Sequence, residues 1–201
     1  MKRKTGYDAI GLDYQKAYSD NPEIKNAINY LSKQLKPNEY VLDVGSGTGF
    51  VAKHLTEANL QVLGIDNSNE MNRIAREQAP QAKFIEMNIK KLKLGDQKFD
   101  AIVAFFSLLH IQKGIFKRTL QNLLRHLNDN GYFIISMVEG NIEGEEYYMN
   151  QKMFFSSFPR EELIKLFESL DVKIIKFKEH VFQAKIEGSE EETQLFFYIQ
   201  K

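Results

Sequence analysis

Three glycines at alternate positions form the motif with the clearest chemistry in the sequence. Residues 41–49 read VLDVGSGTG, which places Gly45, Gly47 and Gly49 after a short apolar segment. Glycine has no Cβ, so the backbone can turn tightly at these positions and approach a ligand closely. The helix predicted to follow would present free backbone N–H groups to the same ligand. The motif therefore predicts a ligand-binding turn between a strand and a helix.

A carboxylate next to these glycines indicates the charge of the ligand. The dinucleotide fingerprint G-x-G-x-x-G requires a glycine where this sequence has Phe50. Asp43 is predicted near the carboxyl end of the strand, where its charge would repel a pyrophosphate but attract a cationic ligand. The pattern favours a cationic cofactor over a dinucleotide. A glycine-rich turn that only joins a strand to a helix is the alternative interpretation.

With this motif the sequence resembles the class I S-adenosylmethionine-dependent methyltransferases, whose first motif has the same form. The resemblance extends over about residues 7–201. It implies S-adenosylmethionine as the cofactor, with contacts from Asp43, Gly45, Ser46 and Gly47.

The next predicted strand ends in a second carboxylate, Asp66. It follows Gly45 by about 20 residues, the spacing at which an acidic residue accepts hydrogen bonds from ribose hydroxyls in dinucleotide folds. The resemblance gives Asp66 this role toward the adenosine ribose, whereas the alternative is a helix cap. The other cofactor contacts that the resemblance implies are Tyr14, Asn67, Met71, Asn88, Ile89, Ala104 and Phe105.

For three of these residues the sequence allows another interpretation or departs from the family motif. Met71 has the spacing of a core methionine as well as that of an adenine contact, and Tyr14 can equally anchor a surface helix. Asn88 stands where many family members have Asp. Its side-chain oxygen can accept the same hydrogen bond from the adenine amino group.

Two ionisable residues, His110 and Glu139, are predicted at the ends of the fourth and fifth strands. Methyl transfer from a sulfonium is an in-line displacement with a good leaving group, so the protein mainly positions the reactants and excludes water. His110 is a candidate general base because its ordinary pKa is near neutral. Alternatively, His110 only packs at a helix start, and Glu139 only begins an acidic loop.

The elements that must position these residues alternate between helical and strand patterns. The predicted helices cover residues 22–36, 50–60, 69–78, 113–127 and 159–170, and the predicted strands cover residues 40–44, 61–65, 83–87, 99–105, 132–138, 172–182 and 193–199. Such alternation predicts an α/β fold with a parallel sheet and right-handed crossovers. The last two strands have no helix between them, so the last one is predicted to be antiparallel. The resemblance implies a three-layer, doubly wound, Rossmann-like sheet of seven strands.

Two segments outside this alternation are predicted to surround the acceptor. The whole chain, residues 1–201, is predicted to be one domain, with an N-terminal lid over about residues 1–36 and an insertion over about residues 140–158. The insertion has no clear period, and it follows the fifth strand, where open α/β sheets bind their ligands. Its candidate pocket walls are Tyr147, Tyr148, Phe154 and Phe155.

The amino-acid composition excludes several classes of binding partner. Lys+Arg and Asp+Glu both number 27, so no net charge attracts polyanions and nucleic acid is not the expected partner. The absence of cysteine excludes disulfides, thiolate metal sites and cysteine nucleophiles, and no metal is expected. No segment is long and apolar enough to span a bilayer, so we expect a cytoplasmic protein without a membrane partner.

These observations predict an enzyme that transfers a methyl group from S-adenosylmethionine to an oxygen, nitrogen or carbon atom of a small molecule. Two alternatives stay open at this point. A protein or RNA methyltransferase would use the same cofactor site with a groove completed by its partner. A regulatory protein that binds the cofactor without turnover would have the same motifs.

Overall fold

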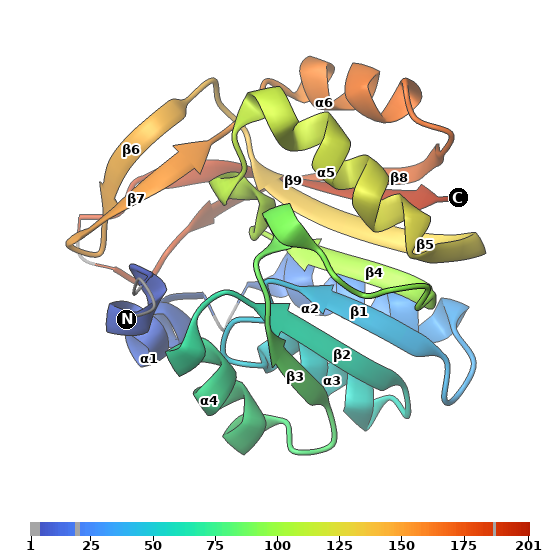
Figure 1. The fold of residues 1–201 in the computed structure, drawn as a ribbon. Coiled ribbons are helices and arrows are strands. Elements are labelled where there is room, and N and C mark those ends of the chain that lie inside the picture. Colours follow the sequence, from blue (N-terminus) through green and yellow to red (C-terminus); the bar gives the residue numbers. More distant parts are fainter. Residues whose placement is uncertain (1–4, 19–20, 187) are drawn as a thin grey trace.

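Seven strands form the central sheet in the computed structural model, which describes residues 5–18, 21–186 and 188–201. Their order is β3-β2-β1-β4-β5-β9-β8 (Figure 1). Their bounds are β1 Tyr40–Val44, β2 Gln61–Asp66, β3 Lys83–Glu86, β4 Phe99–Phe105, β5 Leu127–Val138, β8 Lys173–Gln183 and β9 Glu191–Gln200. Strands β1 to β5 pair in parallel, and β9 is antiparallel to both β5 and β8. The predicted sheet with an antiparallel last strand is confirmed.

Helices cover both faces of the sheet, which explains why its central strands are almost continuously apolar. Figure 1 shows α2 (Pro22–Gln34) and α3 (Phe50–Glu57) behind the sheet and α5 (Lys113–Arg125) in front of it. Leu55 on one side and Phe116 on the other are 0% and 1% exposed. The core therefore consists of two apolar layers, one on each face of the sheet.

Two further helices complete the layers. α4 (Asn69–Gln78) begins at Ser68, whose hydroxyl accepts a hydrogen bond from the backbone N–H of Met71 at 3.1 Å. α6 (Arg160–Glu168) packs against β8, and its Phe167 ring lies 4.9 Å from that of Phe197. None of the helices in the described residues is long and apolar enough to cross a membrane.

The ends of several elements differ from the prediction. α2, α3 and α5 end two or three residues earlier, and β5 begins at Leu127 rather than at residue 132. Leu127 pairs with Phe99 of β4, so this segment joins the sheet before the predicted turn. At that turn Asn130 has a φ of 63°, and its N–H donates to the carbonyl oxygen of Lys201. Long-range pairing has therefore extended the strand across a local turn signal.

The insertion after β5 forms a β-hairpin of its own. β6 (Glu143–Tyr148) and β7 (Gln151–Ser156) pair antiparallel as a separate two-stranded sheet. The two residues that join them, Met149 and Asn150, have φ values of 47° and 59°, as a tight hairpin turn requires. β6 is largely exposed, and neither strand has the regular apolar alternation that would have predicted it.

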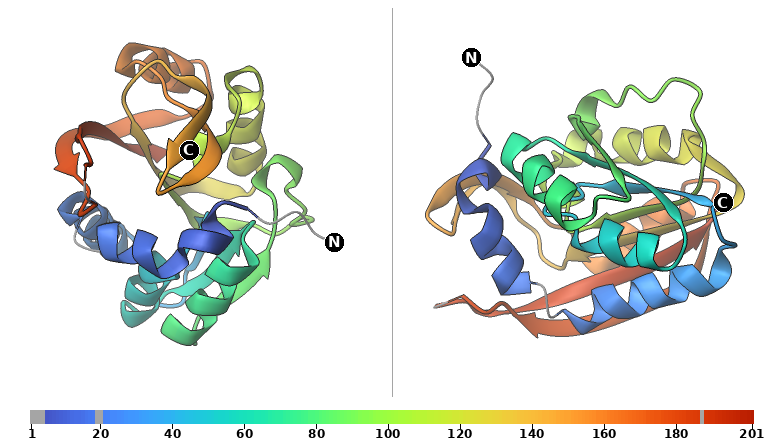
Figure 2. Two further views of the ribbon diagram at one scale, coloured as in Figure 1. Left: turned by 90° about the vertical axis from the view of Figure 1, so that its left-hand side faces the viewer. Right: turned by 90° about the horizontal axis from the view of Figure 1, so that it is seen from below.

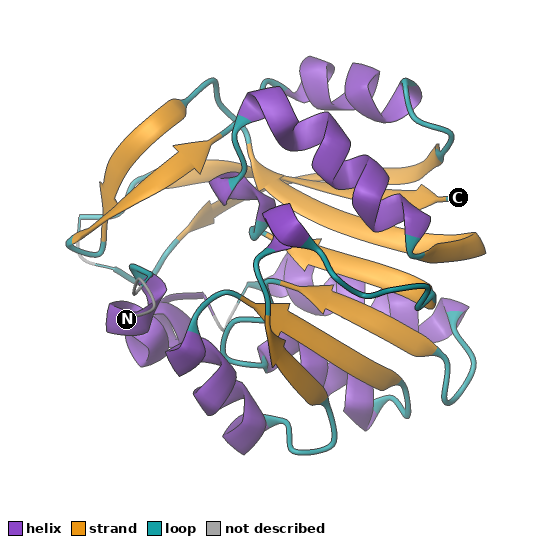
Figure 3. Cartoon of the chain, in the orientation of Figure 1, coloured by secondary structure: helices purple, strands orange, loops and turns teal. Residues whose placement is uncertain are grey.

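The predicted lid over about residues 1–36 falls on two helices in different places; residues 1–4 and 19–20 lie outside the described residues. α2 packs in the core, where Ile28 and Leu31 are 3% and 0% exposed. α1 (Tyr7–Tyr18) instead lies with the β6–β7 hairpin at the end of the sheet to which the arrowheads of β1, β2 and β4 point (Figures 1 and 3). Figure 2 shows both segments from that end.

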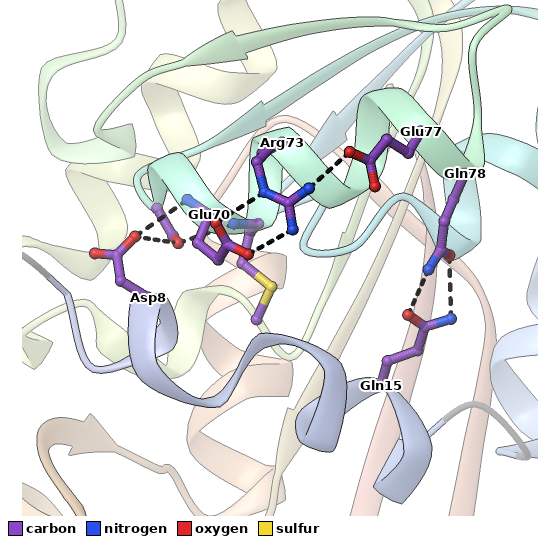
Figure 4. A network of polar contacts seen from close by, with 8 residues as sticks. Asp8, Gln15, Glu70, Arg73, Glu77 and Gln78 are labelled. Carbon is purple, nitrogen blue, oxygen red and sulfur yellow. Dashed lines mark hydrogen bonds and ion pairs between the residues drawn. The ribbon is translucent and has the colours of Figure 1, made fainter.

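Polar contacts attach α1 along the length of α4 (Figure 4). At one end, Oδ1 of Asp8 accepts hydrogen bonds from the Ser68 hydroxyl at 2.7 Å and from the Glu70 backbone N–H at 3.2 Å. At the other end, the side-chain amides of Gln15 and Gln78 exchange two hydrogen bonds, at 3.1 and 2.6 Å. These contacts fix α1 over the open end of the sheet.

Candidate functional site

The glycine motif forms a left-handed turn between β1 and α3. Gly45, Gly47 and Gly49 have φ values of 69°, 52° and 85°, a region that glycine enters without steric cost. A Cβ atom on Gly45 would lie 2.2 Å from the Cβ of Ser107, and one on Gly49 would lie 3.0 Å from Ala75. Both backbone conformation and space therefore require glycine at positions 45 and 49.

A cavity of about 320 Å³ opens beside this turn, at the carboxyl ends of β1, β2 and β4. Nine of the twelve predicted cofactor residues line it, namely Tyr14, Gly45, Gly47, Asp66, Asn67, Met71, Asn88, Ile89 and Phe105. The other three, Asp43, Ser46 and Ala104, are buried outside its lining. We call this space the first cavity.

The carboxylate of Asp66 lies in the first cavity and is held by backbone N–H groups. Its Oδ2 accepts from Gly47 at 2.9 Å and its Oδ1 from Ser68 at 2.8 Å. Burial raises the pKa of Asp66, although the backbone hydrogen bonds oppose this effect. Each carboxylate oxygen has further acceptor capacity, so Asp66 is oriented to receive a pair of hydroxyl donors.

Asp43 is a buried carboxylate with an unmet hydrogen-bonding capacity. It is 2% exposed, and its Oδ2 has no hydrogen-bond partner within the described part of the chain. Burial, with a smaller contribution from the charge of Asp66, raises the pKa of Asp43 to about 7. A cationic group bound near the glycine turn would favour the ionised carboxylate. This arrangement fits a cationic ligand.

The opposite end of the first cavity is built by α4 and a short 3₁₀ helix, η1 (Ile89–Lys91). Asn88 begins η1, and its side-chain Oδ1 accepts from the backbone N–H of Lys90 at 2.9 Å. Met71 is 1% exposed and also lines the cavity, so it belongs both to the core and to the cavity wall. Together these residues form a mixed polar and apolar wall that suits one edge and one face of a flat heterocycle.

His110 lies on the far side of the first cavity and is hydrogen-bonded at both ring nitrogens. Its Nδ1 is 2.7 Å from the carbonyl oxygen of Phe154, which can only accept, so Nδ1 carries the proton. Its Nε2 therefore accepts from the hydroxyl of Tyr7, 2.8 Å away. Burial lowers the pKa of His110, which favours the neutral ring, and the Nε2 lone pair is directed at the Tyr7 hydroxyl.

Comparison with known proteins assigns this geometry to a family. A family model described as a methyltransferase domain matches residues 41–131, which run from β1 to β5. An uncharacterised methyltransferase of Alkaliphilus oremlandii is 31% identical over 114 residues, 57% of this chain and 51% of the relative. Residues 41–131 of this chain thus match a methyltransferase domain.

Further relatives agree with this assignment. A demethylmenaquinone methyltransferase of Renibacterium salmoninarum is 29% identical over 100 residues, 50% of this chain and 41% of the relative. The chain spans about half the length of the first curated relatives that it matches. A Burkholderia thailandensis 1,6-didemethyltoxoflavin-N1-methyltransferase, solved with S-adenosylhomocysteine, has the same fold with a TM-score of 0.69. It is 20% identical, and the match covers 97% of this chain and 85% of that one.

In the methyltransferase domain, the second candidate catalytic residue, Glu139, is paired with a cation. The guanidinium of Arg160 donates to its two carboxylate oxygens at 2.7 and 2.6 Å. These hydrogen bonds lower the pKa of Glu139. The carboxylate is thus a weak proton acceptor, and it lines a second cavity rather than the first.

The second cavity, of about 230 Å³, lies between α1 and the β6–β7 hairpin. Tyr147, Tyr148 and Phe155, three of the predicted pocket walls, line it, whereas Phe154 lines the first cavity. Tyr147 is 78% exposed and therefore adds little to the wall. Three residues line both cavities, which therefore adjoin at this place: Tyr7, Tyr14 and Phe106.

Two of these shared residues were not among the predicted site residues. Phe106 follows β4 with a φ of 54°, an uncommon value for a bulky residue, and Ser136 holds it there by accepting its backbone N–H at 3.0 Å. Tyr7 lies within the predicted N-terminal lid, and this position was its only signal. The contact of Tyr7 with His110 spans 103 positions, so no local pattern predicts it.

Proposed function

We propose that the methyltransferase domain binds S-adenosylmethionine in the first cavity and methylates a small molecule held in the second. The observation that carries this proposal is the pair of adjoining cavities, which share Tyr7, Tyr14 and Phe106 in their walls. A transfer reaction requires two ligands in contact and shielded from water. The names of the demethylmenaquinone and didemethyltoxoflavin methyltransferases give small molecules as the substrates of those relatives, which supports the same class here.

The residues of the first cavity fit this cofactor. Asp66 would accept both ribose hydroxyls, the glycine turn would admit the methionine part close to the backbone, and buried Asp43 would favour its positive charge. Asn88, Ile89 and Met71 would contact the adenine ring. When bound, the cofactor supplies an electrophilic methyl group on a sulfonium. The protein then has to orient the acceptor and remove its proton.

Tyr7 and His110 form the path by which this chain would remove that proton. Tyr7 lines both cavities, and its hydroxyl donates to Nε2 of His110. As the acceptor gives its proton to the Tyr7 oxygen, Tyr7 passes its own proton to His110, and the phenol remains neutral. The direct base is therefore His110, and Tyr7 connects it to the acceptor. Glu139 has no such role here because Arg160 occupies both of its oxygens.

Calorimetry with the full chain tests the cofactor. S-adenosylmethionine and S-adenosylhomocysteine should bind with one-to-one stoichiometry, and NAD should not. Incubation of the protein and radiolabelled S-adenosylmethionine with a metabolite extract should then produce labelled small molecules. Label found only in macromolecules would overturn the small-molecule acceptor, and binding of NAD without either sulfur ligand would overturn the cofactor.

A further inference from the structure

Six aromatic rings form a closed circle at the border of the two cavities. Each ring centroid lies within 6.5 Å of the next, and the circle returns to its starting residue. In order, the pairs are His110–Tyr7 at 5.3 Å, Tyr7–Tyr14 at 5.4 Å, Tyr14–Tyr18 at 5.0 Å, Tyr18–Tyr148 at 6.5 Å, Tyr148–Phe155 at 5.9 Å and Phe155–His110 at 4.9 Å. We call these residues the aromatic circle.

The aromatic circle is assembled from three elements that are distant in the sequence. Its members come from α1, from the 3₁₀ helix η2 (Leu108–His110) and from the β6–β7 hairpin. All of them except His110 line the second cavity. Four are tyrosines, whereas the core beneath the sheet uses mainly aliphatic residues and phenylalanine. Five aromatic rings of the circle therefore line a space that a ligand can enter.

A carboxylate without a cationic partner faces the same space. Glu192 of β9 lines the second cavity and is half-buried; its carboxylate accepts from the side-chain amide of Gln194 at 2.7 Å. No lysine or arginine among the described residues forms an ion pair with it. Burial and, less strongly, the charge of Glu192 raise the pKa of both Tyr14 and Tyr18, that of Tyr18 to about 12. The carboxylate therefore lies within electrostatic reach of the aromatic circle.

The other carboxylates of the second cavity are of a different kind. Glu139 is neutralised by Arg160, and Glu146 is exposed to solvent. Glu192 alone among the three is both half-buried and without a described cation. A neutral aromatic acceptor would stack on the tyrosines but would leave this charge desolvated and unpaired, which is costly. An anionic acceptor would be repelled.

We propose that the second cavity binds a small amine, so that the methyltransferase domain transfers methyl groups to nitrogen. This inference rests on the proposed function. Faces of aromatic rings attract ammonium groups through their quadrupoles, and a nearby carboxylate adds a full negative charge. The aromatic circle and Glu192 provide both, and they do so beside the cavity assigned to the cofactor.

The transfer step balances with the groups that this proposal names. The ammonium form of the acceptor first loses a proton through the Tyr7 hydroxyl to His110. The nitrogen lone pair then forms the N–C bond while the S–C bond breaks, and its electron pair stays on the sulfur. The products are neutral S-adenosylhomocysteine and a methylated ammonium ion, which the aromatic circle also stabilises.

A pair of isosteric probes tests this inference on the full chain loaded with S-adenosylhomocysteine. Choline and 3,3-dimethylbutan-1-ol have nearly the same shape, but only choline is a cation. Chemical-shift titrations should show about tenfold tighter binding of choline or more. Equal or tighter binding of the neutral alcohol would overturn the amine acceptor. Binding of S-adenosylhomocysteine is measured first, so loss of the proposed function itself would appear at that earlier step.

Two matched pairs of variants identify the groups responsible. Glu192→Gln should weaken choline binding about tenfold without affecting the alcohol, whereas Glu191→Gln, on the exposed neighbour, should change neither. Tyr148→Leu should weaken choline binding severalfold, whereas Tyr148→Phe, which keeps the ring face, should not. Equal choline affinity in Glu192→Gln and Glu191→Gln, or in the two Tyr148 variants, would contradict the proposed cation site.

Discussion

The two cavities of this methyltransferase domain are built in different ways. The polar contacts of the first come from two local motifs, the glycine turn and the end of β2, where the backbone N–H groups of Gly47 and Ser68 donate to Asp66, while α1 and the hairpin add to its wall. The second is made from side chains of α1, η2, the hairpin and β9, which meet only in the folded protein. Local motifs thus place the polar contacts assigned to the cofactor, whereas tertiary packing builds the cavity assigned to the acceptor.

Tyr7→Phe should have the largest effect on methyl transfer relative to its effect on cofactor binding. The variant removes the hydroxyl between the acceptor and His110 but keeps the ring in the aromatic circle. General-base catalysis typically contributes about 10²–10⁴-fold, so methyl transfer should slow by about 10²-fold or more, while cofactor affinity stays within twofold. Single-turnover rates and calorimetry measure the two quantities. An unchanged rate would contradict the proposed role of Tyr7 and His110 in proton transfer.

A substitution at Gly45 should have the largest effect on the first cavity. Alanine would adopt a strained φ of 69° and place its Cβ 2.2 Å from that of Ser107. The strain and overlap together cost several kcal/mol, so the turn should shift to relieve them, and Gly45→Ala should thereby weaken S-adenosylhomocysteine binding by about 100-fold or more. Gly114→Ala is the control, since Gly114 lies in α5 with nothing within 4 Å of the added Cβ. Equal affinities of the two variants would contradict the close approach of backbone to cofactor.

Loss of the contact between Asp66 and the ribose hydroxyls should weaken cofactor binding less than the Gly45 substitution. Hydrogen bonds to charged groups contribute about 1.5–3 kcal/mol each, so Asp66→Ala should weaken cofactor binding by about tenfold to a hundredfold. Circular dichroism must show that the variant folds, because Asp66 also accepts from Gly47 and Ser68. If the variant folds and binds the cofactor with wild-type affinity, Asp66 only stabilises the turn and does not contact the ribose.

Asp43 should give the folded protein a pH-dependent stability. With a pKa of about 7 in the folded protein and about 4 when unfolded, Asp43 keeps its proton only in the folded state between these values. The free energy of unfolding of the ligand-free protein should therefore fall as pH rises from about 4 to 7, and this slope should be smaller in Asp43→Asn. Urea unfolding at several pH values compares the two proteins. Parallel curves would contradict the raised pKa.

Cofactor binding gives a second measure of the same residue. A cation beside Asp43 favours its ionised form, so binding of S-adenosylmethionine near pH 7 should release a fraction of a proton. Calorimetry in buffers with different ionisation enthalpies detects this release, and Asp43→Asn should lack it. Proton release of the same size in both proteins would assign it to another group.

The sequence predicted the sheet and the first cavity because their determinants are local. The alternation of apolar segments fixes the order of elements, and the GSGTG turn lies next to the strand that presents it. The pairing of Tyr7 with His110 joins segments 103 positions apart, so no spacing rule predicts it. The hairpin was missed because β6 is mostly exposed and neither of its strands has a regular apolar alternation. Phe106 was missed because its left-handed backbone depends on Ser136 in the neighbouring strand.

A crystal structure of the protein grown with S-adenosylhomocysteine tests the assignment of the two cavities most directly. We predict that the ligand binds in the first cavity and that both ribose hydroxyls donate to Asp66. Its sulfur should be directed toward Tyr7, Tyr14 and Phe106, which line both cavities. The second cavity should remain free of this ligand. Electron density for S-adenosylhomocysteine in the second cavity, or away from Asp66 and the glycine turn, would contradict the account.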